Sequence, residues 1–170
     1  GAFPGGNATN TVTITSASGN RNDVIIKEYN IQDAVVLTNS ANLIFTHVTI
    51  GDTSTTQNGV VIAGTLDNAH FYDCNIYSVL GATSNTYNAV KRDAGSTMLV
   101  KDLSFLKCNI RGGDYNFYMI NAGTSSTAYG TMTIDSCNLL DAYYSGYFGS
   151  YPVYNILTAR HNYIHNASNS

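Results

Sequence analysis

Three adjacent charged residues, Lys91, Arg92 and Asp93, are the leading catalytic candidates in this sequence because they interrupt an apolar pattern. Their segment aligns with an earlier one in which Ile62 stands where Arg92 does, so an alternating strand would point Arg92 inward. A buried guanidinium without a partner is very costly. We therefore expect the strand to end at Val90 and the charges to lie on a loop. The alternative is an Arg92–Asp93 pair at a working site.

Aromatic side chains crowd residues 143–154 and form the strongest signal for ligand binding. Exposed aromatic rings can stack on the faces of sugars while tyrosine hydroxyls form hydrogen bonds, so carbohydrate is the expected ligand. The alternative is a segment that folds over the body as a lid or contacts another chain. The candidate ligand-binding residues are Tyr143, Tyr144, Tyr147, Phe148, Tyr151, Tyr154 and Tyr115, and Tyr118 could extend the same surface.

The cysteines and histidines do not form the pattern of a metal site. Cys74, Cys108 and Cys137 are separated by 34 and 29 residues and lack the closely spaced pair of a zinc site. We expect them to be reduced, buried thiols that act as small hydrophobic side chains. His161 and His165 are four residues apart, but in a segment predicted as strand, where the helical metal pairing does not apply. No metal and no cofactor are expected.

The composition indicates a single domain, residues 1–170, with a mostly neutral surface. Of 170 residues 44% are hydrophobic and 11% are charged, and the net charge is -3. Because the charge is low and scattered, nucleic acid is not an expected partner. No stretch approaches the roughly 20 consecutive apolar residues that a bilayer requires, so membrane insertion is not expected. We expect a segment of a larger secreted or surface protein.

A repeat around the three cysteines predicts the fold. The six copies are centred on Tyr29, Val48, Cys74, Cys108, Cys137 and Asn162. Five residues before each centre stand Val24, Leu43, Ala69, Leu103, Met132 and Leu157, and three before it Ile26, Phe45, Phe71, Phe105, Ile134 and Ala159. Two residues after it stand Ile31, Ile50, Ile76, Ile110, Leu139 and Ile164. All three columns are apolar, which indicates that they point inward.

The residue directly before each centre is polar in all six copies, which indicates a solvent-facing column. These residues are Glu28, His47, Asp73, Lys107, Ser136 and His161. We expect Glu28 to lie beside His47 and Asp73 beside Lys107, in weak cross-strand pairs.

The columns predict stacked coils, in which parallel strands place like residues about 4.8 Å apart. Two mostly polar residues interrupt the alternation before each centre, which indicates a corner. A further strand-like run precedes most copies. We therefore expect an all-β, single-stranded right-handed parallel β-helix of about six coils, with three faces per coil and long side loops. Function is expected in the loops, at 51–58, 78–88, 112–116, 122–130 and 140–152.

The pattern apolar-x-apolar-x-x-Asn-x-apolar, complete in residues 157–164, resembles the repeat of the pectate-lyase-like superfamily. The resemblance covers residues 11–167 and implies the β-helix. Other copies replace the corner asparagine, although Asn30, Asn75, Asn109 and Asn138 form a partial ladder one position later. Uronate-cleaving lyases of this superfamily use basic side chains with calcium on an outer face, which by resemblance implicates Lys91, Arg92 and Asp93. The sequence lacks the carboxylate clusters that the related hydrolases need.

The leading expectation is a non-catalytic extracellular or cell-surface module that contacts carbohydrate, or protein, through its side loops. One alternative is a polysaccharide lyase-like fragment that acts on uronate polymers, the one case in which calcium is expected. The other is the structural shaft of an adhesin or a phage tail-spike-like protein. Whichever function holds, we expect an oligomer or further coils to cap the ends of the solenoid.

Overall fold

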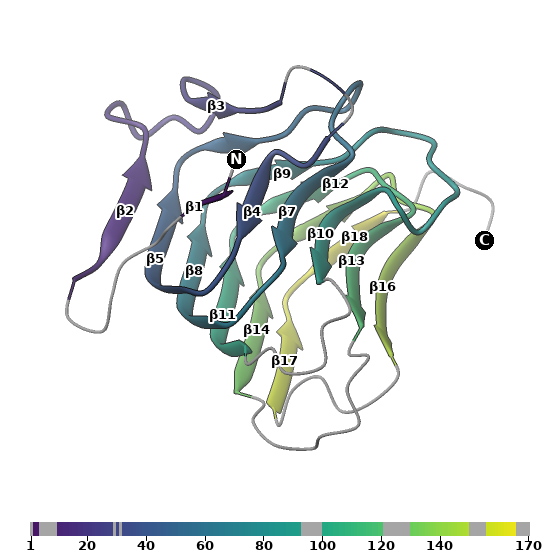
Figure 1. Ribbon diagram of the computed structural model, residues 1–170. Helices are drawn as coiled ribbons and strands as arrows, with labels where there is room; N and C mark the ends of the chain where they lie inside the picture. Colours follow the sequence, from purple (N-terminus) through teal and green to yellow (C-terminus); the bar gives the residue numbers. More distant parts are fainter. Residues whose placement is uncertain are drawn as a thin grey trace.

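The computed structural model describes residues 2–3, 10–28, 30, 32–92, 100–120, 130–149 and 156–165. Every regular element among them is a β-strand, and the strands form three parallel sheets of six strands each. The chain visits the three sheets in a constant order, so that successive coils stack along one axis (Figure 1). The predicted all-β parallel solenoid with three faces is confirmed.

The three sheets take one strand each from every coil. Sheet A contains β1 (Ala2–Phe3), β4 (Val35–Leu37), β7 (Asn58–Ile62), β10 (Asn88–Arg92), β13 (Tyr115–Ile120) and β16 (Tyr144–Gly149). Sheet B contains β2 (Val12–Thr15), β5 (Ser40–Thr46), β8 (Leu66–Tyr72), β11 (Val100–Leu106), β14 (Thr131–Asp135) and β17 (Ile156–Arg160). Sheet C contains β3 (Ile25–Ile26), β6 (Thr49–Ile50), β9 (Asn75–Tyr77), β12 (Asn109–Arg111), β15 (Asn138–Leu140) and β18 (Tyr163–His165).

The number of complete turns is smaller than the six coils that the repeat predicts. The four coils from β4 to β15 have strand neighbours on both sides in every sheet. The strands β1 to β3 and β16 to β18 form the two edges of the described stack. The solenoid therefore has about four fully stacked turns.

Side chains of like type stack inside the solenoid, as the columns predict. On sheet B, Phe71 pairs with Phe45 on one side and with Phe105 on the other. Their ring centroids are 5.0 and 4.8 Å apart and their planes are nearly parallel. All three rings are fully buried, and burying each contributes about 1.5–3 kcal/mol. This stack forms the centre of the core.

The register predicted for the first copy of the repeat is wrong. Val12 of β2 begins the column assigned to Val24, and Ile26 of β3 begins the column assigned to Ile31. The carbonyl of Val24 accepts a hydrogen bond of 2.9 Å from the next coil, as the cysteine carbonyls do, so Val24 takes the place predicted for Tyr29. The physical reason is the connection 16–23, which separates the first strands of sheets B and C. Tyr29 and Ile31 lie outside the described residues.

The predicted corner between sheets B and C is a single residue in the left-handed backbone region. Five coils place a non-glycine residue there, with φ between 51° and 56°: His47, Asp73, Lys107, Ser136 and His161. This conformation turns the chain sharply, and it costs roughly 1–2 kcal/mol in an L-residue. The corner is therefore imposed by the packing on either side of it rather than by local preference.

An asparagine ladder follows this corner on sheet C. The side-chain amide of Asn109 donates to the Oδ1 of Asn75 over 3.1 Å, and that of Asn138 donates to Asn109 over 2.7 Å. The ladder continues from Asn75 to the hydroxyl of Thr49 over 3.0 Å. The partial ladder predicted from the sequence is confirmed for these three asparagines.

The three cysteines are free and buried, as predicted. Each thiol lies 3.4 Å from the carbonyl of the stacked phenylalanine in the preceding coil, so that the sulfur column runs beside the ring column. Burial raises the pKa of the Cys108 thiol well above its usual value. The thiols therefore act as core side chains and weak hydrogen-bond donors.

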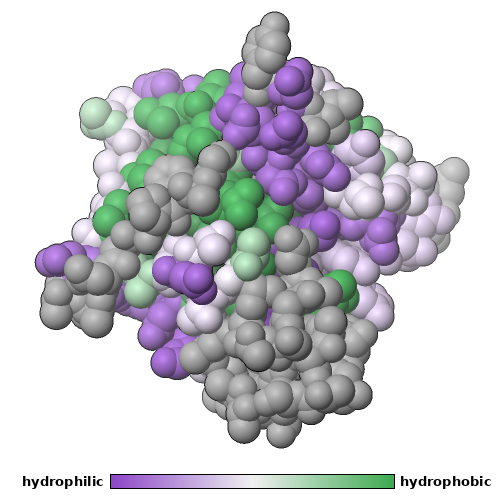
Figure 2. All heavy atoms as spheres, in the orientation of Figure 1, coloured by the Kyte–Doolittle hydropathy of each residue, from purple (hydrophilic) through white to green (hydrophobic). Residues whose placement is uncertain are grey.

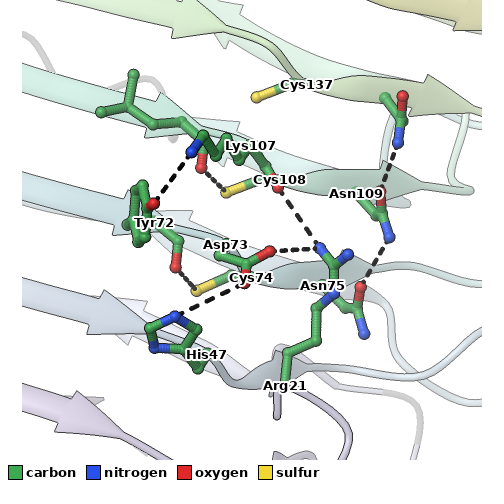
Figure 3. A network of polar contacts seen from close by, with 12 residues as sticks. Arg21, His47, Tyr72, Asp73, Cys74, Asn75, Lys107, Cys108, Asn109 and Cys137 are labelled. Carbon is green, nitrogen blue, oxygen red and sulfur yellow. Dashed lines mark hydrogen bonds and ion pairs between the residues drawn. The ribbon is translucent and has the colours of Figure 1, made fainter. Parts of the chain in front are cut away.

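The charged side chains at the corner pair differently from the prediction (Figure 3). Asp73 lies 3.1 Å from the guanidinium of Arg21 and 3.7 Å from His47. Lys107 instead reaches the hydroxyl of Tyr72 over 3.2 Å. The connection 16–23 is the reason, because it brings Arg21 over the corner to the carboxylate that Lys107 was expected to contact.

Candidate functional site

Two columns of tyrosine lie on the outer face of sheet A. The register pairs Tyr115 of β13 with Tyr144 of β16, and Tyr118 with Tyr147. Tyr118 lies between the buried residues Phe117 and Met119 of β13, so it points to the opposite, outer side. The ring of Tyr115 lies 5.0 Å from that of Tyr118 and shares this side, because the strict alternation is broken at the buried Asn116. The parallel register of the two strands therefore gathers tyrosines that are distant in the sequence.

A polar ladder at the start of β7, β10 and β13 holds these strands of sheet A in register. Asn58 of β7 donates from its side-chain amide to Asp33 over 2.6 Å. Asn88 of β10 is buried, and its backbone N–H donates to the Oδ1 of Asn58 over 2.8 Å. The carbonyl of Tyr87 then receives the backbone N–H of Asp114 over 2.7 Å. These bonds place the first residues of β7, β10 and β13 above one another.

Five tyrosine rings form one continuous block, which we call the tyrosine surface: Tyr115, Tyr118, Tyr143, Tyr144 and Tyr147. Tyr115 and Tyr144 stack at 4.9 Å, and Tyr118 and Tyr147 stack at 5.5 Å. Tyr115 joins the two columns, since its ring lies 5.0 Å from Tyr118 and 5.9 Å from Tyr147. Tyr143 packs edge-on against Tyr144 at 4.6 Å.

The exposed parts of the tyrosine surface are its rim and one end. Stacking occupies the ring faces within each column, so the rings present edges and hydroxyls along the outer face of the sheet. Strand β16 is the last strand of sheet A in the described chain, so each of its tyrosine rings has a stacking neighbour on one side. Tyr144 is 45% exposed and Tyr147 is 42% exposed. These two rings therefore offer aromatic faces to a ligand.

The hydroxyl of Tyr115 remains protonated at neutral pH. Burial raises the pKa of Tyr115 above its ordinary value, and the neighbouring carboxylate of Asp114 raises it further. Asp114 is itself buried, and burial raises its pKa. The hydroxyl of Tyr118 accepts a hydrogen bond of 3.2 Å from the side-chain amide of Asn85. The surface thus combines aromatic carbon with neutral groups that donate and accept hydrogen bonds.

Comparisons with protein-family models, curated proteins and solved structures found no match.

Most of the predicted ligand-binding residues come together, and one does not. Tyr115, Tyr143, Tyr144 and Tyr147 share the tyrosine surface, and Tyr118 extends it. Phe148 points the other way, because its register partner is Met119 of the core and its ring lies 6.3 Å from Phe117. Tyr151 and Tyr154 lie outside the described residues.

The prediction that a loop begins after Val90 is wrong. Strand β10 continues to Arg92, which pairs with Ile62 and is fully buried. Lys91 points to the outer face, in register with Tyr118. Alternation therefore places the two basic candidates on opposite sides of the sheet, and Asp93 lies outside the described residues.

Two groups near the tyrosine surface escape the sequence analysis: Asn85 and Asp114. The alignment of Asn58 with Asn88 could have revealed them. Extending that register to the next coil places Tyr115 and Tyr118 beside β10, and therefore close to the residues that flank these two strands. Within the described ranges, no three histidine, cysteine or acidic side chains converge as they do around a metal ion. In the same part of the chain, no helix is long and apolar enough to cross a membrane.

Proposed function

We propose that this protein is a carbohydrate-binding β-solenoid whose ligand binds to the tyrosine surface. The observation that carries the proposal is the contiguity of five tyrosine rings on one outer face, contributed by two neighbouring coils. Scattered aromatic side chains are normal on protein surfaces, but a continuous patch rimmed by polar groups is typical of an interaction site.

The chemistry of the surface suits sugars better than other ligands. A sugar ring has apolar C–H faces and a periphery of hydroxyls, which match aromatic faces and phenol groups. Lys91, in register with Tyr118, adds one positive charge beside the surface and no basic cluster. The low charge of the whole chain, 11% of residues, gives an anionic polymer little to bind.

In the proposed binding mode, one sugar ring stacks on Tyr144 or Tyr147, which lie on the last described strand of sheet A. The next units follow the outer face of sheet A and form hydrogen bonds with the hydroxyls of Tyr115 and Tyr118. Because the rings support one another, the surface is preorganised, and binding costs little side-chain entropy.

We infer that the module is non-catalytic. A lyase of the kind that the pectate-lyase-like resemblance implies would need its basic residues together on an outer face. Lys91 faces outward and Arg92 faces the core, which supports binding without cleavage. Incubation with uronate polymers and calcium tests the alternative: a rise in absorbance from unsaturated products would restore the lyase function.

Affinity electrophoresis against a panel of soluble polysaccharides, followed by calorimetry, tests the binding function. We expect replacement of Tyr144 and Tyr147 by alanine to weaken binding at least tenfold, since each aromatic stacking contact contributes about 0.5–1.5 kcal/mol beyond its area. Tyr72→Ala is the matched control, because Tyr72 is a 37% exposed tyrosine on sheet B. Equal binding by the double variant and the parent would refute the proposed site.

A further inference from the structure

Two loops at the corner between sheets C and A enclose a small pocket. It has a volume of about 210 Å³ and lies between the turn after β6 and the connection from β9 to β10. Its lining includes Ser54, Thr55, Val79, Leu80, Ala82 and Tyr87. Pockets that enclose a whole drug-sized ligand measure roughly 300–1,000 Å³, so this pocket fits one substituent or one sugar unit.

Backbone hydrogen bonds hold the pocket walls in place. The N–H of Val79 donates to the carbonyl of Thr56 over 3.0 Å, and that of Leu80 donates to Thr53 over 3.1 Å. The N–H of Tyr87 closes its own loop by donating to Ser84 over 3.0 Å. These bonds join the two loops to each other, so the pocket exists before a ligand enters.

The hydroxyls in the pocket wall have already used their hydrogens. Ser54 donates its hydroxyl to Asp52 over 3.1 Å, and Thr55 donates its hydroxyl to the same carboxylate over 2.9 Å. Burial raises the pKa of Asp52, but hydrogen bonds from Thr55 and Ser54 outweigh that effect and hold it well below its usual value. Because ionised Asp52 can only accept, both hydroxyls must donate to it. Their oxygens remain free to accept a hydrogen bond from a ligand.

The rest of the lining is uncharged and mostly apolar, with the phenol ring of Tyr87 at one side. Val79, Leu80 and Ala82 contribute aliphatic carbon, and Leu80 is 41% exposed. The pocket therefore offers hydrogen-bond acceptors on one wall and an apolar surface on the other. The complementary group carries an N–H donor next to a methyl group.

The pocket adjoins the tyrosine surface along the direction in which the coils stack. Asn85, in the same connection as the pocket residues, donates to the hydroxyl of Tyr118 over 3.2 Å. Tyr87 lines the pocket, and its carbonyl receives the N–H of Asp114, the residue before Tyr115. A chain of sugars can therefore contact both features at once.

We propose that this pocket receives the acetamido group of an N-acetylated amino sugar, within the glycan that the tyrosine surface binds. The amide N–H donates to the hydroxyl oxygen of Ser54 or Thr55, and the methyl group packs against Leu80 and Ala82. The proposal rests on the carbohydrate-binding function proposed above and adds the class of sugar.

Other common sugar substituents fit the pocket less well. A carboxylate needs donors, and the hydroxyls of Ser54 and Thr55 already donate to Asp52. An O-acetyl ester has the methyl group but no N–H. A hydroxymethyl group can donate a hydrogen bond but leaves the apolar wall uncovered.

Calorimetry with two tetrasaccharides of the same β-1,4 linkage tests the proposal: one of N-acetylglucosamine and one of glucose. These ligands differ only in the acetamido group at carbon 2. We expect the N-acetylated tetramer to bind about tenfold more tightly, because its acetamido group adds one buried methyl group and one net hydrogen bond. Ala82→Trp, which fills the pocket, should remove the difference. Thr83→Trp is the matched control, because Thr83 is an exposed neighbour outside the lining and its variant should keep the preference.

The outcomes separate this proposal from the proposed function. Equal affinities for the two tetramers would overturn the acetamido pocket and leave the tyrosine surface intact. A preference that survives Ala82→Trp, or that Thr83→Trp abolishes equally, would also overturn it. If neither tetramer nor any polysaccharide of the panel binds, the proposed function and the pocket both fall. The Tyr144 and Tyr147 double variant should lose affinity for both tetramers alike.

Discussion

Among single residues, Asp135 shows how the exposed corner of the solenoid tunes a carboxylate. Hydrogen bonds from His161, over 3.0 Å, and from Arg160, over 2.9 Å, lower its pKa to about 2. All three residues come from neighbouring strands or corners of sheet B. Their pairing follows from the stacking of coils, which places Arg160 in register with Asp135.

We predict that Asp135 titrates near pH 2 in the folded protein. Because the folded pKa lies below the unfolded value of about 3.9, its contribution to stability is present above pH 4 and is lost as the pH falls through about 2. A carboxyl-detected NMR titration measures the pKa directly. Replacing His161 with glutamine removes the largest cause and should raise the pKa. A wild-type value near 4 would contradict the predicted pairing.

The residues of the site were partly predictable from the sequence. The aromatic richness of 143–154 points to Tyr143, Tyr144 and Tyr147, but one-in-two alternation sends Phe148 to the core side. The high cost of burying an unpaired guanidinium predicts a loop at Arg92. The neighbouring coils impose the strand on it, since Asn88 and Val90 are locked into the ladder of β7. Tertiary packing thus overrides the preference of one residue.

Within the strands, the main stabilising feature is the stack of Phe45, Phe71 and Phe105 on the inner face of sheet B. Phe71 has a stacked ring on both sides, at 5.0 and 4.8 Å. Because close-packed interiors collapse only partly around a deleted side chain, the loss of this ring leaves a cavity as well as lost burial.

We predict that Phe71→Ala lowers the free energy of unfolding by about 3–5 kcal/mol, the range for deletion of a buried aromatic ring. Denaturant unfolding followed by circular dichroism measures the loss. Tyr72→Ala provides the control from the next position of the same strand, where the side chain is exposed, and should change stability by about 0.5 kcal/mol or less. Similar losses in the two variants would show that burial on this strand has been misassigned.

The corner between β14 and β15, like the equivalent corner of each other coil, is a strained element of the fold. Ser136 has φ of 56° and is exposed, with a side-chain hydrogen bond only to its neighbour Asp135 among the described contacts. Glycine avoids the left-handed penalty of roughly 1–2 kcal/mol but adds about 0.5–1 kcal/mol of unfolded-state entropy.

We therefore predict that Ser136→Gly raises the free energy of unfolding by about 0.5–1 kcal/mol. Ser136→Val should lower it, because a β-branched side chain tolerates this backbone region worst. Thermal unfolding of the two variants against the parent measures both changes. If valine proves as stable as glycine, the corner does not adopt the left-handed conformation.

The strands of sheets B and C were predictable because their inner columns repeat without gaps around the cysteines. The register failed in the first coil, where residues 16–23 separate Ile14 from Val24 and no cysteine marks the centre. Spacing alone could not reveal an insertion inside a copy, because connections of every length occur elsewhere in the chain. The strands of sheet A repeat less regularly, and their outer tyrosines become adjacent through the pairing of β13 with β16.

At the scale of the whole molecule, both edges of the described stack expose residues that belong to inner columns. Leu157 is 44% exposed and Ile164 is 57% exposed at one edge, and Val12 is 38% exposed at the other. Figure 2 shows hydrophobic side chains at the surface near the first strands, in the orientation of Figure 1. Open sheet edges with unpaired backbone groups favour pairing with another strand.

The two edges match one another column by column. Val12 and Leu157 belong to the same apolar column of sheet B, and Ile26 and Ile164 belong to the same column of sheet C. A second copy stacked head to tail would therefore continue both columns with side chains of the usual kind. Such a heterologous contact does not close on itself, so it generates a series of sizes rather than a discrete dimer.

We predict concentration-dependent self-association of the protein as expressed, seen in sedimentation velocity as a series of species. Because the contact buries apolar columns, 0.5 M salt should leave it intact, whereas association through surface charges weakens as the Debye length shrinks below about 10 Å. Ile164→Lys places a charge in the inner column of the edge and should abolish the larger species. Tyr72→Lys puts the same charge on the outer face of sheet B and should not. Only Ile164 lies where a stacking coil would make contact, so only its variant should change assembly. A single species at all concentrations, or equal behaviour of the two variants, would show that the exposed columns do not mediate assembly.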